Sequence, residues 1–185
     1  SLRTGLRSYL PFDGNYNDAS GNGINASAMG SPTFVAGAVG SGAMLATTKS
    51  ADSVYNYATL GNQLDFGSTE DFSVSFWAKV TSVSGDPGLI GNKDWDSGSN
   101  PGFVIFTTSS RRARWNYRNS DSARVDSNVP PEAFPVDQWG HVVVSYDRGG
   151  NATTYVNGNL IDTRSLGANG TTFQAEGMTL NIGQD

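Results

Sequence analysis

Apolar and polar residues alternate along several short stretches of the chain, most clearly in "FSVSFWAKV" at positions 72–80. Phe72, Val74 and Phe76 fall on one side of an extended chain, and the serines between them fall on the other side together with Trp77. A period of two residues is that of a β-strand with one buried face. The stretch "HVVVSYD" alternates in the same way. Both stretches therefore predict strands.

A two-residue turn is predicted inside "TTYVNGNLIDT", because Asn157 and Gly158 both tolerate the positive φ angles of a type I′ hairpin. With the turn in "YDRGGNAT" before it, residues 140–164 form a predicted three-stranded antiparallel meander. No helical apolar period is sustained along the chain, so no helix is expected. The further predicted strands are 6–12, 33–36, 42–46, 53–57, 102–107, 112–117 and 178–183. Many short strands without crossover helices predict an all-β fold, an antiparallel two-sheet jelly-roll sandwich.

Composition agrees with this fold and narrows the classes of function. The 185 residues include 23 Gly and only 16% charged residues. They fit one domain, positions 1–185, which we expect to be part of a larger protein. Cysteine is absent, which excludes disulfides, thiolate metal sites and a cysteine nucleophile. The net charge of −5 argues against nucleic acid as a partner, and no apolar stretch is long enough to span a membrane.

Four segments together resemble laminin-G-like domains, which are jelly-roll domains of the concanavalin A-like lectin/glucanase type. They are "SYLPFDGNYNDASGNGINA", "DFSVSFWAKV", "WGHVVVSYDRGGNATTYVNGNLI" and "LNIGQD", in that family's order and spacing. The resemblance runs from about Leu6 to the last residue. It implies two packed antiparallel sheets in a secreted or cell-surface protein, often attached to a catalytic domain. It also implies binding of glycans or proteins and, commonly, of calcium.

The sequence differs from that family's pattern at its end. Domains of this kind usually continue past the "NIG" strand into a final strand that pairs with the first, whereas this sequence stops at Asp185. The first predicted strand, 6–12, would then lack a neighbour, and an unpaired apolar edge invites pairing with another chain. We therefore expect a partner chain or another polypeptide segment to complete this sheet edge.

The turn "DGNYNDASGNG" has the composition of a calcium site. Calcium takes six to eight oxygen ligands, and Asp13, Asp18 and Asn22 can supply some of them from a chain that glycines allow to bend. The resemblance also places a frequent structural calcium ion near this turn. The alternative is a surface turn held by hydrogen bonds of Asp and Asn side chains, which needs the same residue types.

The loop "NKDWDSGSNPGF" is a candidate carbohydrate contact. Trp95 can stack on a pyranose ring while Lys93, Asp94 and Asn100 hydrogen-bond the sugar hydroxyl groups. The spacing of the acidic residues excludes a helix–loop–helix calcium site. The alternative is that Trp95 folds back over the core, since tryptophan is usually largely buried.

A second candidate contact is basic. Five of the nine arginines lie in "RRARWNYRNSDSAR". On a strand, Arg112, Arg114 and Arg118 share one face and can bind carboxylates or sulfates bidentately, which indicates an acidic polysaccharide. Trp115, which points to the other face, is a further aromatic candidate for ligand contact. The alternative is a solvent-exposed face whose arginines are neutralised by nearby aspartates.

The sequence does not predict an enzyme. A glycosidase needs two carboxylates at a set separation across its cleft, and no predicted strand carries two acidic residues on one face. The glutamates Glu70, Glu132 and Glu176 lie in predicted turns. His141, the single histidine, has no serine nucleophile motif around it.

The predicted function is a non-catalytic module that binds carbohydrate, on an extracellular or cell-surface protein. Trp77, Trp139 and His141 are interpreted as structural side chains of strands. The alternative is a structural or adhesive module that contacts protein, such as the enzyme to which it is attached. A catalytic glycan hydrolase or lyase is the third possibility.

Overall fold

The computed structural model describes residues 4–47, 55–67, 69–81, 87–93, 100–119, 124–130, 133–167 and 178–184. Within these segments the regular elements are β-strands, and none of the elements is an α-helix. The strands are β1 (Ser27–Met29), β2 (Thr33–Val35), β3 (Ala43–Leu45), β4 (Tyr57–Gly61), β5 (Phe72–Lys79), β6 (Gly88–Gly91), β7 (Gly102–Thr107), β8 (Ala113–Arg118), β9 (Val125–Asp126), β10 (Trp139–Tyr146), β11 (Asn151–Val156), β12 (Asn159–Ser165) and β13 (Leu180–Ile182).

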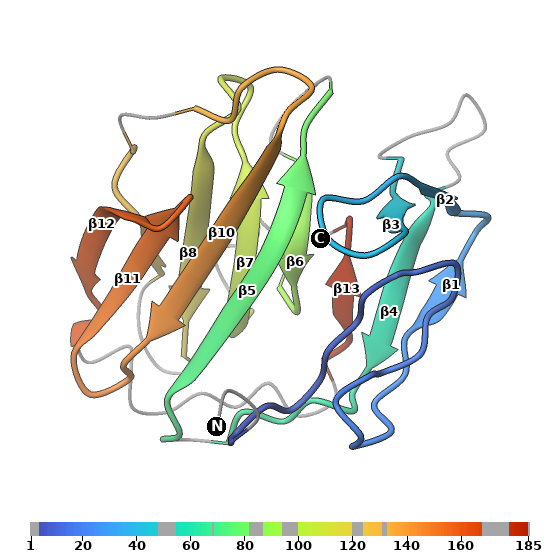
Figure 1. Ribbon diagram of the computed structural model, residues 1–185. Helices are drawn as coiled ribbons and strands as arrows, with labels where there is room; N and C mark the ends of the chain where they lie inside the picture. Colours follow the sequence, from blue (N-terminus) through green and yellow to red (C-terminus); the bar gives the residue numbers. More distant parts are fainter. Residues whose placement is uncertain are drawn as a thin grey trace.

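The strands form two main layers, which confirms the predicted antiparallel sandwich (Figure 1). The larger sheet has the order β1-β4-β13-β6-β7-β8-β9, and the smaller has the order β12-β11-β10-β5. A separate hairpin is made by β2 and β3. The order within both sheets differs from the order along the chain, as in a jelly roll. All pairings between these strands are antiparallel.

The predicted meander is confirmed as β10, β11 and β12. Val156 pairs with Asn159, so Asn157 and Gly158 alone make the turn, with φ angles of 51° and 82°. Positive φ at both central positions defines a type I′ turn, whose twist matches that of the flanking strands. The Asn157 side chain also accepts a hydrogen bond of 2.9 Å from the backbone N–H of His141 on the neighbouring strand.

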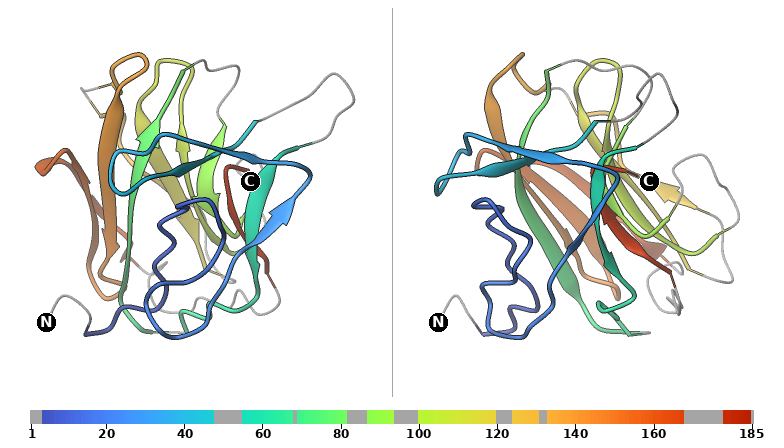
Figure 2. Two further views of the ribbon diagram at one scale, coloured as in Figure 1. Left: turned by 45° about the vertical axis from the view of Figure 1, so that its right-hand side comes forward. Right: turned by 90° about the vertical axis from the view of Figure 1, so that its right-hand side faces the viewer.

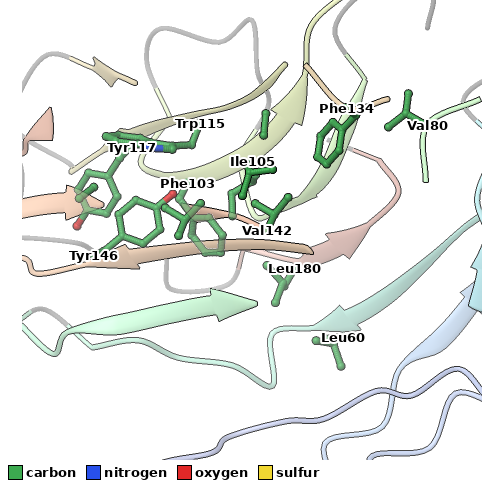
Figure 3. Packing of buried hydrophobic residues seen from close by; sticks show 14 of the residues in the cluster. Leu60, Val80, Phe103, Ile105, Trp115, Tyr117, Phe134, Val142, Tyr146 and Leu180 are labelled. Carbon is green, nitrogen blue, oxygen red and sulfur yellow. The ribbon is translucent and has the colours of Figure 1, made fainter. Parts of the chain in front are cut away.

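The two sheets are joined by a core of aromatic and branched side chains (Figure 3). Trp115 on β8 and Tyr146 on β10 are fully buried and meet edge to face, with ring centroids 5.5 Å apart. Trp115 also donates a hydrogen bond of 3.0 Å from Nε1 to Thr154 Oγ1 on β11. This bond links the larger sheet to the smaller one through groups that have no access to water.

The prediction of a strand at 6–12 is wrong, because the turn that follows binds this segment through side chains. The Tyr9 N–H donates to Asp18 Oδ1, and the Asn22 amide donates to the carbonyl groups of Leu6 and Arg7. The segment runs outside the two layers of strands (Figure 2). The sheet edge that we expected a partner chain to complete is therefore not formed by these residues. Of the strand predicted at 53–57, the first two residues lie outside the described residues, and the observed strand β4 begins at Tyr57.

Candidate binding surfaces

The outer face of the smaller sheet presents an exposed tryptophan. Trp77 on β5 is 46% exposed, whereas its neighbours Phe76 and Ala78 point toward the interior. The interpretation of Trp77 as a packing residue is therefore wrong. The strand alternates as predicted, and Trp77 belongs to the side that it shares with Ser73 and Ser75.

His141 on β10 lies directly opposite Trp77 and holds a fixed position beside it. The two rings are 5.0 Å apart between centroids and inclined by 33°. The Nε2 atom of His141 is 2.9 Å from the Ser75 hydroxyl oxygen, and the His141 backbone is anchored to the Asn157 turn. Indole and imidazole together form a shallow aromatic platform on the sheet. His141 is thus half-buried and part of a surface, as is its neighbour Trp139.

A row of hydroxyl side chains crosses the same face of the sheet beside this platform. Cross-strand pairing places Ser73, Ser145, Thr153 and Thr163 in one line over all four strands. The first two are hydrogen-bonded to each other, with 2.9 Å between their oxygens. Hydroxyl groups donate and accept hydrogen bonds, so they suit a ligand that is itself rich in hydroxyl groups.

The predicted arginine face is used largely within the protein. Arg112 Nη1 donates to the Pro130 carbonyl at 2.6 Å, and Arg114 Nη2 donates to the Ser127 carbonyl at 2.8 Å. The Arg114 guanidinium also lies over the Phe106 ring, 5.9 Å from its centroid. Both side chains hold the segment after β9 against the larger sheet, and each is partly buried.

The prediction that Trp115 contacts a ligand is wrong. Its side chain is fully buried among the other core residues (Figure 3). Its Nε1–H donates to Thr154 Oγ1. Neither face of the ring is open to a sugar.

The predicted carbohydrate loop is placed only at its ends. Asp94 and Trp95 lie outside the described residues. Lys93 is 2% exposed, so its prediction as a surface contact is wrong, and Asn100 is half-buried. Gly102, which follows this loop, pairs with Arg118 on β8. The described residues that follow the loop and the end of the arginine strand, predicted as separate sites, are thus neighbours in the larger sheet.

The residues predicted for calcium are tied to different parts of the chain. Asp13 Oδ1 accepts the N–H groups of Gly42 and Ser41, at 2.7 and 2.6 Å, and these bonds lower the pKa of Asp13. Asp18 uses both carboxylate oxygens, accepting from the Tyr9, Ser20 and Ile24 N–H groups. This is the geometry of the alternative interpretation, an anchored turn. In the described part of the chain no three acidic or histidine side chains gather as a metal site.

Burial opposes the charged form of Asp18, but the hydrogen bonds outweigh it. The donors are the backbone N–H groups of Tyr9, Ser20 and Ile24 and the Ser20 hydroxyl, which is 2.7 Å from Oδ2. Together they hold the pKa of Asp18 well below its usual value. Calcium binding by Asp13, Asp18 and Asn22 stays a prediction.

Comparison with known families identifies the superfamily of the chain. Residues 52–185 match a family described as the concanavalin A-like lectin/glucanases superfamily. The chain belongs to this superfamily. The predicted family is therefore confirmed, on a match that covers most of the sequence.

Sequence relatives come from clostridial toxins. Botulinum neurotoxin type C from Clostridium botulinum C phage is 31% identical over 101 residues, which is 51% of this chain and 7% of the toxin. Botulinum neurotoxin type E from Clostridium botulinum is 26% identical over 114 residues, or 52% of this chain and 8% of the toxin. The chain thus spans less than a tenth of each of these relatives.

Similar solved structures include receptor-binding parts of such toxins. One is the binding domain of botulinum neurotoxin DC in complex with rat synaptotagmin II (TM-score 0.68, 19% identity, 98% of this chain and 44% of that one). Another is a structure of botulinum neurotoxin type C, whose description states that cell entry depends on interaction with two ganglioside molecules. Its TM-score is 0.65 at 21% identity, and the match covers 96% of this chain and 42% of that one. At these identities the likeness shows the fold alone. No helix among the described residues is long and apolar enough to cross a membrane.

Proposed function

We propose that the chain is a non-catalytic carbohydrate-binding module. The observation that carries this proposal is the exposed Trp77 ring on the outer face of the smaller sheet, beside His141 and next to a row of hydroxyl side chains. An exposed indole offers the apolar surface on which a pyranose ring stacks, and hydroxyl groups then bind the polar rim of the sugar.

The relatives support a binding role rather than catalysis. One solved structure with this fold is described as a binding domain in complex with a protein. The description of another states that cell entry of the toxin depends on interaction with two ganglioside molecules. Because the chain covers less than half of those chains, their ligands support only a general proposal, namely a surface for glycan or protein. We also propose that the module acts outside the cell or on the cell surface, where such glycans are found.

The site proposed here replaces the arginine face as the main candidate. The guanidinium groups of Arg112 and Arg114 already bind backbone carbonyls, whereas the Trp77 ring is open. An acidic polysaccharide is therefore the less favoured ligand class.

Replacing Trp77 by Ala tests this proposal. We expect Trp77→Ala to weaken binding about tenfold, because loss of a stacked ring removes about 1.4 kcal/mol of binding free energy. Affinity gel electrophoresis through soluble neutral and acidic polysaccharides measures the retention. The matched control is Tyr9→Ala, which removes an aromatic ring of similar exposure (48%) from the N-terminal segment. Retention that is equal in the protein and its Trp77→Ala variant contradicts the proposed site.

Contact with another polypeptide is the second candidate function. Val35 and Leu45 share the outer face of the β2–β3 hairpin and are 42% and 41% exposed. On the other face of the hairpin, Phe34 packs on Tyr16, with ring centroids 5.1 Å apart. An apolar pair exposed on a hairpin suits contact with protein. Two results together favour this candidate. The protein captures a defined polypeptide and loses it in the double variant Val35→Ser and Leu45→Ser, and no polysaccharide retains the protein.

A structural calcium ion at the Asp13–Gly23 turn is a separate proposal. Its support is that Asp13 and Asp18 are held in the charged form, which calcium requires. Asp13 fits better, because the backbone N–H groups of Ser41 and Gly42 both bind its Oδ1 atom. Asp18 fits less well, since donors within the protein engage both of its oxygens.

A further inference from the structure

The aromatic platform is one end of a longer apolar stripe. Trp77 pairs with His141, and on the next row Val143 pairs with Tyr155, which in turn pairs with Leu160. Directly paired residues point to the same face of a sheet. Leu160, at the far end on β12, is 57% exposed, more than Trp77 at the near end. The stripe therefore crosses all four strands of the smaller sheet. These strands, β12, β11, β10 and β5, lie side by side in Figure 1.

The local fold directs these side chains outward. On β11, Thr154 and Val156 are buried, so Tyr155 between them points away from the core. The pairing of β11 with β12 shifts at a bulge after Thr154. The extra residue, Ile161, packs against the core, and the bulge thus sets Leu160 opposite Tyr155.

We propose that this stripe binds an uncharged linear oligosaccharide lying across the strands, from Trp77 on β5 to Leu160 on β12. The proposal rests on the proposed function and assigns its ligand class and orientation. Four strands are separated by three spacings of about 4.8 Å, which gives a length of roughly 14 Å. A single sugar ring covers only one end of such a stripe, whereas a short chain covers all of it.

The row of hydroxyl groups supports this orientation. Ser73, Ser145, Thr153 and Thr163 also run from β5 to β12, one row further along the strands than Ser75, Val143, Tyr155 and Leu160. A linear glycan that lies across the strands thus has apolar side chains beneath its rings and hydroxyl groups along one edge. A glycan parallel to the strands would leave the row after one contact.

Charge decides the ligand class. Among the described residues that point outward from the smaller sheet, none is a carboxylate, and Lys79 at the end of β5 is the one permanent cation. A chain of uronic acids or sulfated sugars would need a cation near each acidic group. Within the stripe itself, His141 is the one basic side chain. A neutral glycan therefore fits this surface better than an acidic one.

Length dependence tests this proposal. Isothermal titration calorimetry of the full chain with cello-, manno- and xylo-oligosaccharides of increasing length is expected to show that affinity rises until the ligand spans the sheet and then levels. Leu160→Ala is expected to weaken binding of the longest ligands about fivefold and to leave the shortest unchanged. Trp77→Ala weakens all lengths. The matched control is Val129→Ala, a 61% exposed apolar residue outside this sheet, and circular dichroism checks that each variant folds.

Three outcomes overturn the proposal. Binding that requires Trp77 but neither grows with length nor responds to Leu160→Ala overturns the crossing ligand and leaves the proposed function standing. Stronger retention of acidic than of neutral ligands overturns the ligand class alone. Absence of binding to every glycan, with all variants folded, overturns the proposed function and this inference together.

Discussion

Trp115 and Trp77 differ in what surrounds them, and their removal has different consequences. Trp115 is fully buried and bonded to Thr154, so Trp115→Ala leaves a cavity and a buried hydroxyl without its donor. We expect the free energy of unfolding to fall by about 3–5 kcal/mol. Trp77→Ala, at a half-exposed position, is expected to change it by less than about 1 kcal/mol. Urea unfolding followed by fluorescence measures both. Equal losses would contradict the assignment of core and surface.

The Asp18 carboxylate makes the free energy of unfolding depend on pH. Its folded pKa lies below the unfolded value of about 3.9, so its contribution is present above that pH and is lost as pH falls through the folded pKa. Asp18→Asn is expected to be less stable than the native protein at pH 6, and the difference should shrink as the solution is acidified below about pH 4. Urea midpoints across this range measure it. A difference that stays constant with pH argues against the charged carboxylate as the cause.

The candidate site shows which residue roles follow from sequence. Alternation with Ser73 and Ser75 already placed Trp77 on the polar side of its strand, and only the general tendency of tryptophan to be buried pointed the other way. The roles of Arg112 and Arg114 did not follow from sequence, because their partners are carbonyl groups of a segment whose path depends on tertiary packing.

The β11–β12 turn is the element that sets the register of the smaller sheet. Gly158 has φ of 82°, a conformation that an L side chain adopts at a cost of about 1–2 kcal/mol. Gly158→Ala is therefore expected to lower the free energy of unfolding by roughly 1 kcal/mol, even though no atom lies within 4 Å of the added methyl group. Chemical denaturation measures this. Gly149→Ala, in the β10–β11 turn, is the control, because an added methyl group there meets a side-chain atom only at 3.7 Å and its φ is not positive.

Elements with a strict period were predictable, and elements defined by tertiary partners were not. Strand β7 was predicted with its observed bounds, and the meander was predicted from alternation together with the Asn157-Gly158 turn. The segment 6–12 is as apolar as a strand, but its backbone is satisfied by Asp18 and Asn22 side chains, which a local pattern does not reveal.

At the scale of the whole molecule, calcium binding would be seen as a change in global stability. An ion that binds only the folded chain stabilises it by an amount that grows with ion concentration. If the Asp13–Gly23 turn holds calcium, the thermal midpoint rises on adding calcium and falls on adding a chelator. Asp13→Asn should remove this response. A midpoint that is unaffected by either addition would show that the turn is stabilised by its own hydrogen bonds.

The position of Trp77 on β5 has a mechanical consequence. In the described sheet β5 has one neighbour, β10, to which it pairs along its whole length. A load applied to a glycan held at Trp77 alone would pull on this outermost strand and peel its ladder bonds open one after another. A glycan that also contacts Leu160 would share the same load among four strands. Anchorage under flow or tension would then depend on ligand length more steeply than equilibrium affinity does.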